Sequence, residues 1–147
     1  MLSRKNIIES ITAILVFLFI YTGLSKYQTL NTFRAVLHKS PILRPYSGLI
    51  AITLPGIEIL LSILLIIPKT RRVGLRIAAV MLGVFTIYLI YMVSFTPQLP
   101  CTCGGIIQQL SWTQHIFLNL TLLGISMWAI YLTKKSSSHP SQYSPTT

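Results

Sequence analysis

Four long apolar stretches leave this chain little choice of fold. They cover residues 7–24, 46–67, 73–95 and 112–132, and each is 18 to 23 residues long. A bilayer core of about 30 Å takes roughly 20 apolar residues of helix, and the backbone must bond within the segment because no water reaches it. Only 10% of the residues are charged, against about 25% in an ordinary soluble domain. The sequence therefore predicts an all-α membrane protein, a four-transmembrane-helix bundle.

The whole bundle is expected to form one domain over residues 1–133. The first stretch follows basic residues as a secretory signal would, but its length, Glu9 and the lack of a small-x-small cleavage site predict a retained span. Residues 134–147, "KKSSSHPSQYSPTT", have a polar, proline-containing composition that cannot bury a core. We expect this tail to be disordered.

The segment between the first two spans is too long for a tight turn, which takes about 2–8 residues in bundles. Apolar residues recur in it at helical spacing before Ser40-Pro41: Tyr27, Leu30, Phe33, Val36 and Leu37. The pattern predicts an amphipathic helix at the outer membrane interface. This helix either plugs the top of the bundle or forms a lid over a site.

The basic residues predict the orientation of the bundle. The net charge is +10, but the charges lie between the spans and not on one soluble face, so we expect no nucleic-acid partner. With both termini in the cytoplasm, eight basic residues face inward and four lie in the first outer loop, which agrees with the positive-inside rule. The inner set is Arg4, Lys5, Lys69, Arg71, Arg72, Arg76, Lys134 and Lys135, and the outer set is Lys26, Arg34, Lys39 and Arg44.

The only two cysteines, Cys101 and Cys103, stand in "PQLPCTCGGIIQQLSW" on the predicted outer side. Two residues of extended chain span at most about 6.6–7.2 Å, and a disulfide needs Cα atoms about 4.4–6.8 Å apart, so the pair can close. The ring is small and strained, and strained exposed disulfides exchange readily. Inert thiols remain an alternative. A zinc site would need both thiolates and two of the histidines, His38 and His115, and we expect no metal.

Two further polar groups lie in the spans. Glu58, near the middle of the second span, is the only acid besides Glu9, and a buried carboxylate needs compensation. Ser62 follows one turn later, and we expect partners from other helices. Glu58 either holds two helices together by a hydrogen bond or handles a proton or ligand.

The fourth span begins with a capping box, Ser111 and Gln114, and carries an inward-pointing polar stripe of His115, Asn119 and Ser126. His115 lies on the same side as the cysteines. It is either a satisfied interfacial histidine or a base that helps to form a thiolate. The candidate catalytic residues are thus Cys101, Cys103, Glu58 and His115.

The chain resembles a known family in "GLSKYQTLNTF", "PGIEILLSILLI" and "CTCGGIIQQLSWTQHIFLNL". These segments are similar to the bacterial MauE/DoxX-like redox-associated membrane proteins, in a Bacteroidota-type variant with a C-x-C-G-G loop. Gly104 stands where the methylamine-utilisation branch has Phe, and no Arg precedes Asn119. The resemblance implies a membrane partner for disulfide formation or reduction outside the cytoplasm, often working with thioredoxin-like proteins. It carries over to Cys101 and Cys103 and, more weakly, to Glu58.

These observations predict a multi-pass thiol-disulfide redox protein of the bacterial inner membrane, with cytoplasmic termini and a periplasmic C-x-C loop. Its partner would be a thioredoxin-like extracytoplasmic protein or a membrane client, and whether the chain is itself an enzyme is open. With one cysteine pair, electrons must leave to a partner or to a membrane quinone, although no quinone motif or other cofactor is evident. The alternative is a non-enzymatic scaffold or assembly factor. A carrier built on Glu58 would need paired ionisable residues across several helices, which the sequence does not offer.

Overall fold

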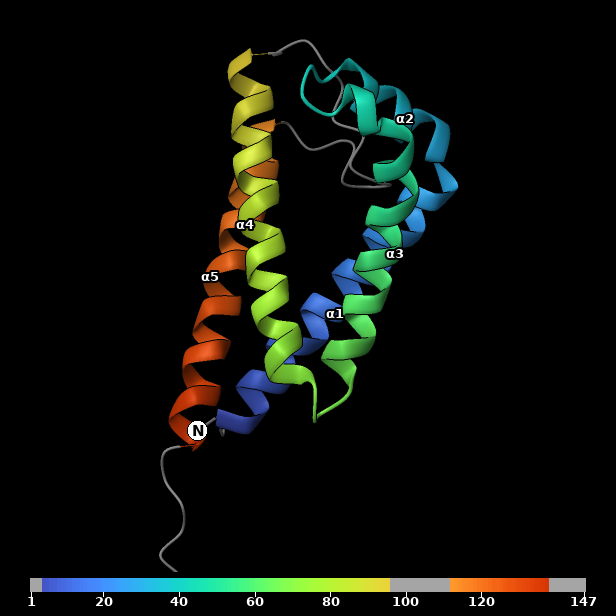
Figure 1. Cartoon of the computed structure of the whole chain (residues 1–147). Coiled ribbons are helices and arrows are strands. Elements are labelled where there is room, and N and C mark those ends of the chain that lie inside the picture. Colours follow the sequence, from blue (N-terminus) through green and yellow to red (C-terminus); the bar gives the residue numbers. More distant parts are fainter. Residues whose placement is uncertain (1–3, 96–111, 138–147) are drawn as a thin grey trace, which may run out of the picture.

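The computed structural model describes residues 4–95 and 112–137 of the chain (Figure 1). Within these ranges it consists of helices: α1 (Arg4–Gln28), α2 (Leu30–Lys39), the 3-10 turn η1 (Arg44–Tyr46), α3 (Ser47–Ile66), α4 (Arg71–Phe95) and α5 (Trp112–Ser137). Four of them, α1, α3 together with η1, α4 and α5, are long and apolar enough to cross a membrane. The predicted four-span α-helical bundle is confirmed.

The outward faces of these helices are apolar. Phe17, Val80, Ile87 and Phe117 are each exposed by 67 to 74%. Exposing such side chains to water would cost free energy. Exposing them to lipid tails costs none, because the tails are as apolar as the side chains. The bundle surface is therefore suited to contact with the lipid bilayer.

Two helices run further than the apolar pattern predicts. The apolar pattern predicts that the first helix ends at residue 24, but α1 continues to Gln28, where the backbone N–H of Thr29 still donates to the Ser25 carbonyl at 3.0 Å. The last continues to Ser137, so residues 134–137 are helical and not part of a disordered tail. A helix need not stop where hydrophobicity stops, since its backbone bonds and the favourable placing of Lys134 near the carbonyl end still stabilise it. Residues 138–147 lie outside the described part.

The four long helices pack as two close pairs, which together form the bundle. The closest pairings are α1 with α3 and α4 with α5, and contacts of α3 with α4 and of α1 with α5 close the bundle. The α1–α3 crossing is tight because Gly23 has no side chain: a Cβ there would lie 3.2 Å from the Pro55 carbonyl oxygen. Tyr27 joins the same two helices, since its hydroxyl donates to the Ile52 carbonyl at 3.1 Å.

The α2 helix lies over one end of the bundle, as the amphipathic pattern predicts (Figure 1). It begins at Leu30, so Tyr27, the first residue of the predicted pattern, belongs to α1 instead. Its Phe33 and Leu37 are buried against Ala51 of α3 and form a small core at this end. A larger core, which includes Leu15, Leu61 and other members from α1, α3, α4 and α5, fills the bundle elsewhere. A pocket remains between the two cores.

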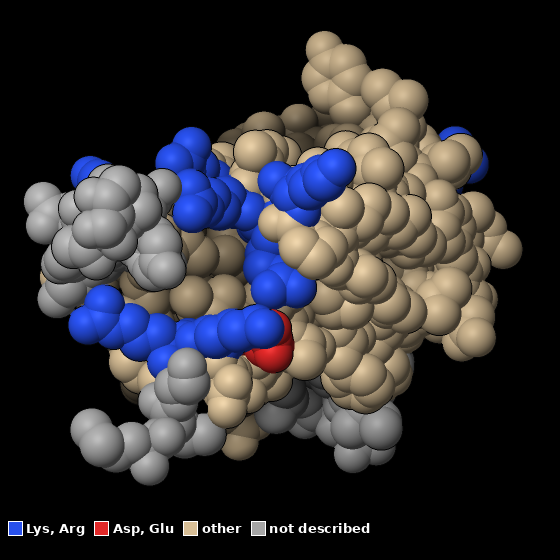
Figure 2. All heavy atoms as spheres, turned by 90° about the horizontal axis from the view of Figure 1, so that it is seen from below, with Lys and Arg blue, Asp and Glu red and all other residues tan. Residues whose placement is uncertain are grey.

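Basic side chains gather at the opposite end. Figure 2 views the molecule from the end that carries the start of α1, the α3–α4 turn and the end of α5, and lysine and arginine side chains gather on part of this face. The segments at this end carry residues that the sequence assigns to the inner side: Arg4, Lys5, Lys69, Arg71, Arg72, Arg76 and Lys134. Glu9, on the same helix as Arg4 and Lys5, is exposed. The ends of α4 and α5 that flank residues 96–111 lie at the α2 end.

Candidate functional site

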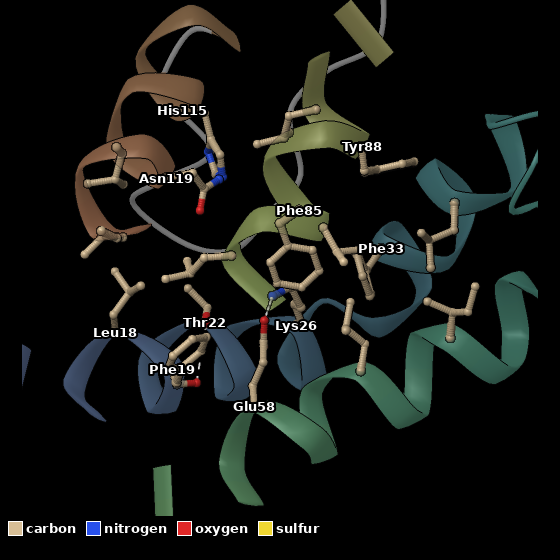
Figure 3. A pocket seen from close by; sticks show the side chains of 18 of the residues that line it. Leu18, Phe19, Thr22, Lys26, Phe33, Glu58, Phe85, Tyr88, His115 and Asn119 are labelled. Atoms are coloured by element: carbon tan, nitrogen blue, oxygen red, sulfur yellow. Dashed lines mark hydrogen bonds and ion pairs between the residues drawn. The ribbon is translucent and has the colours of Figure 1, made fainter. Parts of the chain in front are cut away.

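The pocket has a volume of about 280 Å³ and is lined by side chains from all five α-helices. Most of the lining is apolar, including Phe33 and Leu37 of α2 and Phe85 of α4. The polar side chains in it are few: Thr22, Lys26, Glu58, Tyr88, His115 and Asn119 (Figure 3). A mostly apolar cavity with a few convergent polar groups is the usual form of a small-molecule site.

A buried ion pair joins the first two spans. Nζ of Lys26, in the last turns of α1, lies 2.5 Å from Oε1 of Glu58 on α3, and the two side chains are only 7% and 1% exposed. Glu58 thus has the partner on another helix that the sequence predicts. The close α1–α3 approach at Gly23, one turn before Lys26, brings the two backbones near enough for the pair to form.

Aromatic rings surround the ammonium group. Nζ of Lys26 lies 5.9 Å from the centroid of the Phe33 ring and 5.6 Å from that of Phe85. A cation within about 6 Å of an aromatic face is attracted by the ring quadrupole, more strongly where water is excluded. Phe33 of α2 and Phe85 of α4 therefore help to stabilise the positive charge that Lys26 of α1 brings into the bundle.

The second carboxylate oxygen of Glu58, Oε2, is not part of this ion pair. Within the described residues, Oε2 is buried and has no hydrogen-bond partner. Ser62, one turn further along α3, donates at 3.0 Å to the backbone carbonyl of Glu58 and not to its carboxylate. The Thr22 hydroxyl lies near the Glu58 carboxylate and donates to the Phe19 carbonyl at 3.4 Å. A buried acceptor in this state has unused capacity for a ligand or a proton.

The polar stripe of α5 points inward, as predicted. His115, Asn119 and Ser126 are exposed by only 9, 7 and 0%. His115 and Asn119 project into the pocket from α5 (Figure 3), whereas the Ser126 hydroxyl donates to the Leu122 carbonyl at 2.7 Å and does not line it. The structure thus brings Glu58 and His115 to one cavity, although they stand on different helices.

The other residues that the sequence predicts for a site either lie away from this pocket or fall outside the described residues. Cys101 and Cys103 fall in the segment 96–111, outside the described residues. His38 of α2 lines a second pocket, which is at the surface and also contains Arg34 and Arg44. Its Nδ1 is 3.4 Å from the Ser47 hydroxyl. His38 and His115 therefore line different cavities.

Lys26 is the site residue that sequence reasoning misses. Its assignment to the first outer loop is wrong, because the helix continues past it and its side chain turns into the bundle. Two signals could have found it: Phe19, Thr22 and Gly23 precede it at helical spacing on one face, and a lone membrane acid requires a cation from a neighbouring span. The expectation that the sequence offers no paired ionisable groups across helices is corrected by the same ion pair.

Comparisons with known proteins address the whole chain. A protein-family model described as "Methylamine utilisation protein MauE" matches residues 4–132, which cover all four spans, the pocket and the cysteine loop. A comparison with curated proteins found no match. A comparison with solved structures also found none.

Proposed function

The chain belongs to the MauE family, and from this premise we propose that it is a membrane thiol-disulfide redox protein. Its Cys101 and Cys103 exchange electrons with a thioredoxin-like protein or a client outside the cytoplasm. One observation carries the proposal: the only two cysteines in the sequence are spaced so that they can form a disulfide with each other, and the sequence offers no third cysteine for a longer-range disulfide. A structural disulfide would join distant segments, and this one joins none.

The chemistry is an exchange of two electrons. The thiolate of one cysteine attacks a sulfur of the partner's disulfide, which forms a mixed disulfide and releases the other partner sulfur. The second cysteine then attacks the first, so the partner leaves as a dithiol and Cys101 and Cys103 are left oxidised. In the reverse direction, the same steps oxidise the partner.

We assign the attack to Cys103. It lies nine residues before Trp112, the first residue of α5, and the positive partial charge of a helix N-terminus favours a thiolate. His115, in the first turns of the same helix, is a candidate base for the thiol proton, and Glu58 is a candidate proton-handling group deeper in the pocket.

The charge distribution supports the orientation that the exchange requires. With Lys26 counted as part of α1, the first loop holds three basic residues, Arg34, Lys39 and Arg44, against eight at the other end. The positive-inside rule then favours cytoplasmic termini. We accordingly propose a multi-pass protein of the bacterial inner membrane whose C-x-C loop faces the periplasm, where disulfides persist.

Single serine variants test the proposal. Each changes one atom, and neither should shift the melting temperature noticeably, because the small ring closes almost no chain entropy. Cys101→Ser removes the resolving thiol and should accumulate a covalent adduct that is visible on a non-reducing gel and lost with reductant. Cys103→Ser and the double serine variant are matched controls that should form none.

The alternative scaffold function makes the opposite prediction. A scaffold needs no thiol chemistry, so the double serine variant would support normal function in cells and neither single variant would trap a partner. That combination of results would replace the redox proposal by the scaffold.

A further inference from the structure

Thiol exchange at the periplasmic loop would use His115 and Glu58 of the pocket only to move protons, and it gives the cavity between them no role, yet this cavity has the features of a binding site. It reaches from Glu58, in the middle of α3, to His115 in the first turns of α5. It therefore lies inside the membrane-spanning part, on the side where α4 and α5 lead into residues 96–111 (Figures 1 and 3). A ligand would reach it from the bilayer more readily than from water.

The charge of the pocket selects a neutral ligand. Lys26 and Glu58 neutralise each other at 2.5 Å, so an anionic head group near Lys26 would meet the carboxylate and a cationic one would meet the ammonium. Burying a further uncompensated charge costs several kcal/mol in a site whose lining is mostly apolar. The occupant should be neutral and apolar in its body.

The hydrogen-bonding groups select a ligand with oxygen acceptors. A lysine ammonium has three N–H donors. Within the described residues, the Lys26 ammonium donates to Glu58 Oε1. The Asn119 amide supplies donors from α5, across the pocket from α1. Phe33 and Phe85 add flat apolar faces beside the Lys26 ammonium, against which a ring can stack.

The volume sets the size of the group that fits. Sites for drug-sized ligands hold about 300–1,000 Å³, so a cavity of about 280 Å³ takes a ring system with its substituents and not a phospholipid with its head group. A long tail would have to leave between the helices into the bilayer.

We propose that this pocket binds the ring of a lipid-soluble quinone, with one carbonyl oxygen accepting from Lys26 and the other from Asn119. Glu58, whose Oε2 has no partner within the described residues, is placed to exchange a proton with the bound ring. Binding depends only on the pocket. The role of the quinone as redox partner of the cysteines rests on the proposed function.

The redox step balances without a further reactant. When Cys101 and Cys103 pass from dithiol to disulfide, one S–S bond forms, two S–H bonds break, and two electrons and two protons are released. A quinone takes up the same two electrons and two protons and becomes the quinol. A quinol that reduces the disulfide is the same reaction in reverse.

Binding is tested with the full chain in nanodiscs of one synthetic phosphatidylcholine. The probe is a benzoquinone with a ten-carbon tail, and the control probe is benzene with the same tail. We expect saturable binding of the quinone above that seen in empty nanodiscs, and no saturable binding of the benzene. Equal binding of both probes would make the pocket an acyl-chain site and overturn the inference.

Two pocket variants locate the site. Asn119→Leu removes one donor, and Lys26→Met with Glu58→Leu removes the ion pair without leaving a buried charge. Each should weaken quinone binding about tenfold or more, which is the effect of losing a buried hydrogen bond to a ligand. Thr121→Val, an exposed change on α5, is the matched control, and melting temperatures establish that each variant is folded.

The outcomes separate this inference from the proposed function. Failure of wild type to bind, or unchanged binding in both folded pocket variants, would overturn the inference whatever the serine variants show. The double serine variant at Cys101 and Cys103 should bind quinone like wild type. Quinone binding, together with normal function of the double serine variant and no mixed disulfide in either single variant, would leave the pocket assignment standing and refute the redox function instead.

Discussion

The Lys26–Glu58 pair allows the most quantitative test of how this bundle is held together. At 2.5 Å and an effective dielectric constant of about 20, the attraction between the two charges is about 6–7 kcal/mol. Desolvation offsets most of it, because each ion loses several kcal/mol of hydration when it is buried. The net contribution of the pair to stability should therefore be small, although each charge depends strongly on the other.

Removing one partner exposes this dependence. Lys26→Met leaves a buried carboxylate and Glu58→Leu leaves a buried ammonium, and each should lower the free energy of unfolding by about 3–5 kcal/mol. That is a large share of the roughly 5–15 kcal/mol by which a domain is stable. Glu58→Gln should cost less than Glu58→Leu, because the amide oxygen still accepts from Lys26.

The double variant should behave differently from the sum of its parts. Lys26→Met together with Glu58→Leu removes both charges, so its stability should lie within about 1 kcal/mol of wild type or above it. The measurement is an unfolding titration with a denaturing detergent in mixed micelles. Lys69→Met, at an exposed position in the α3–α4 turn, is the control and should stay within about 0.5 kcal/mol of wild type.

Two results would refute the reasoning. If the double variant loses as much stability as both single variants together, the two side chains do not interact. If each single variant costs less than about 1 kcal/mol, the charges are hydrated in the folded protein and the pocket is not dry.

Three further predictions address other parts of the chain. Gly23→Ala should be less stable than Gly83→Ala by about 1–3 kcal/mol in the same titration, because a Cβ at Gly23 meets the Pro55 carbonyl at 3.2 Å whereas one at Gly83 meets nothing within 4 Å; equal stability would mean that the helices can move apart freely. Phe33→Ala should cost about 3–5 kcal/mol and Phe117→Ala much less, since the first ring is 6% and the second 67% exposed; similar losses would show that α2 does not pack on the bundle. A membrane-impermeant thiol reagent applied to intact cells after mild reduction should label the cysteine pair, and labelling only after the inner membrane is opened would reverse the orientation.

The spans, the interfacial helix and the polar stripe are predictable from sequence because each depends on local order along the chain. Apolar runs near 20 residues determine which segments cross a bilayer, and a period of 3.6 determines that Phe33 and Leu37 share a face. The inward turn of His115 and Asn119 follows from the same period. The need of Glu58 for a partner on another helix is also readable, since an acid at this depth must be compensated.

Only the tertiary structure identifies that partner and forms the pocket. Lys26 follows the apolar run, so its charge alone predicts a loop residue, and its burial depends on where α1 ends and how closely Gly23 lets α1 approach α3. The pocket needs side chains from five helices, and its lining runs from Leu18 of α1 to Leu122 of α5. Local patterns indicate which face of a helix is buried, but which buried faces meet, and what space they leave, depends on the packing of the whole bundle.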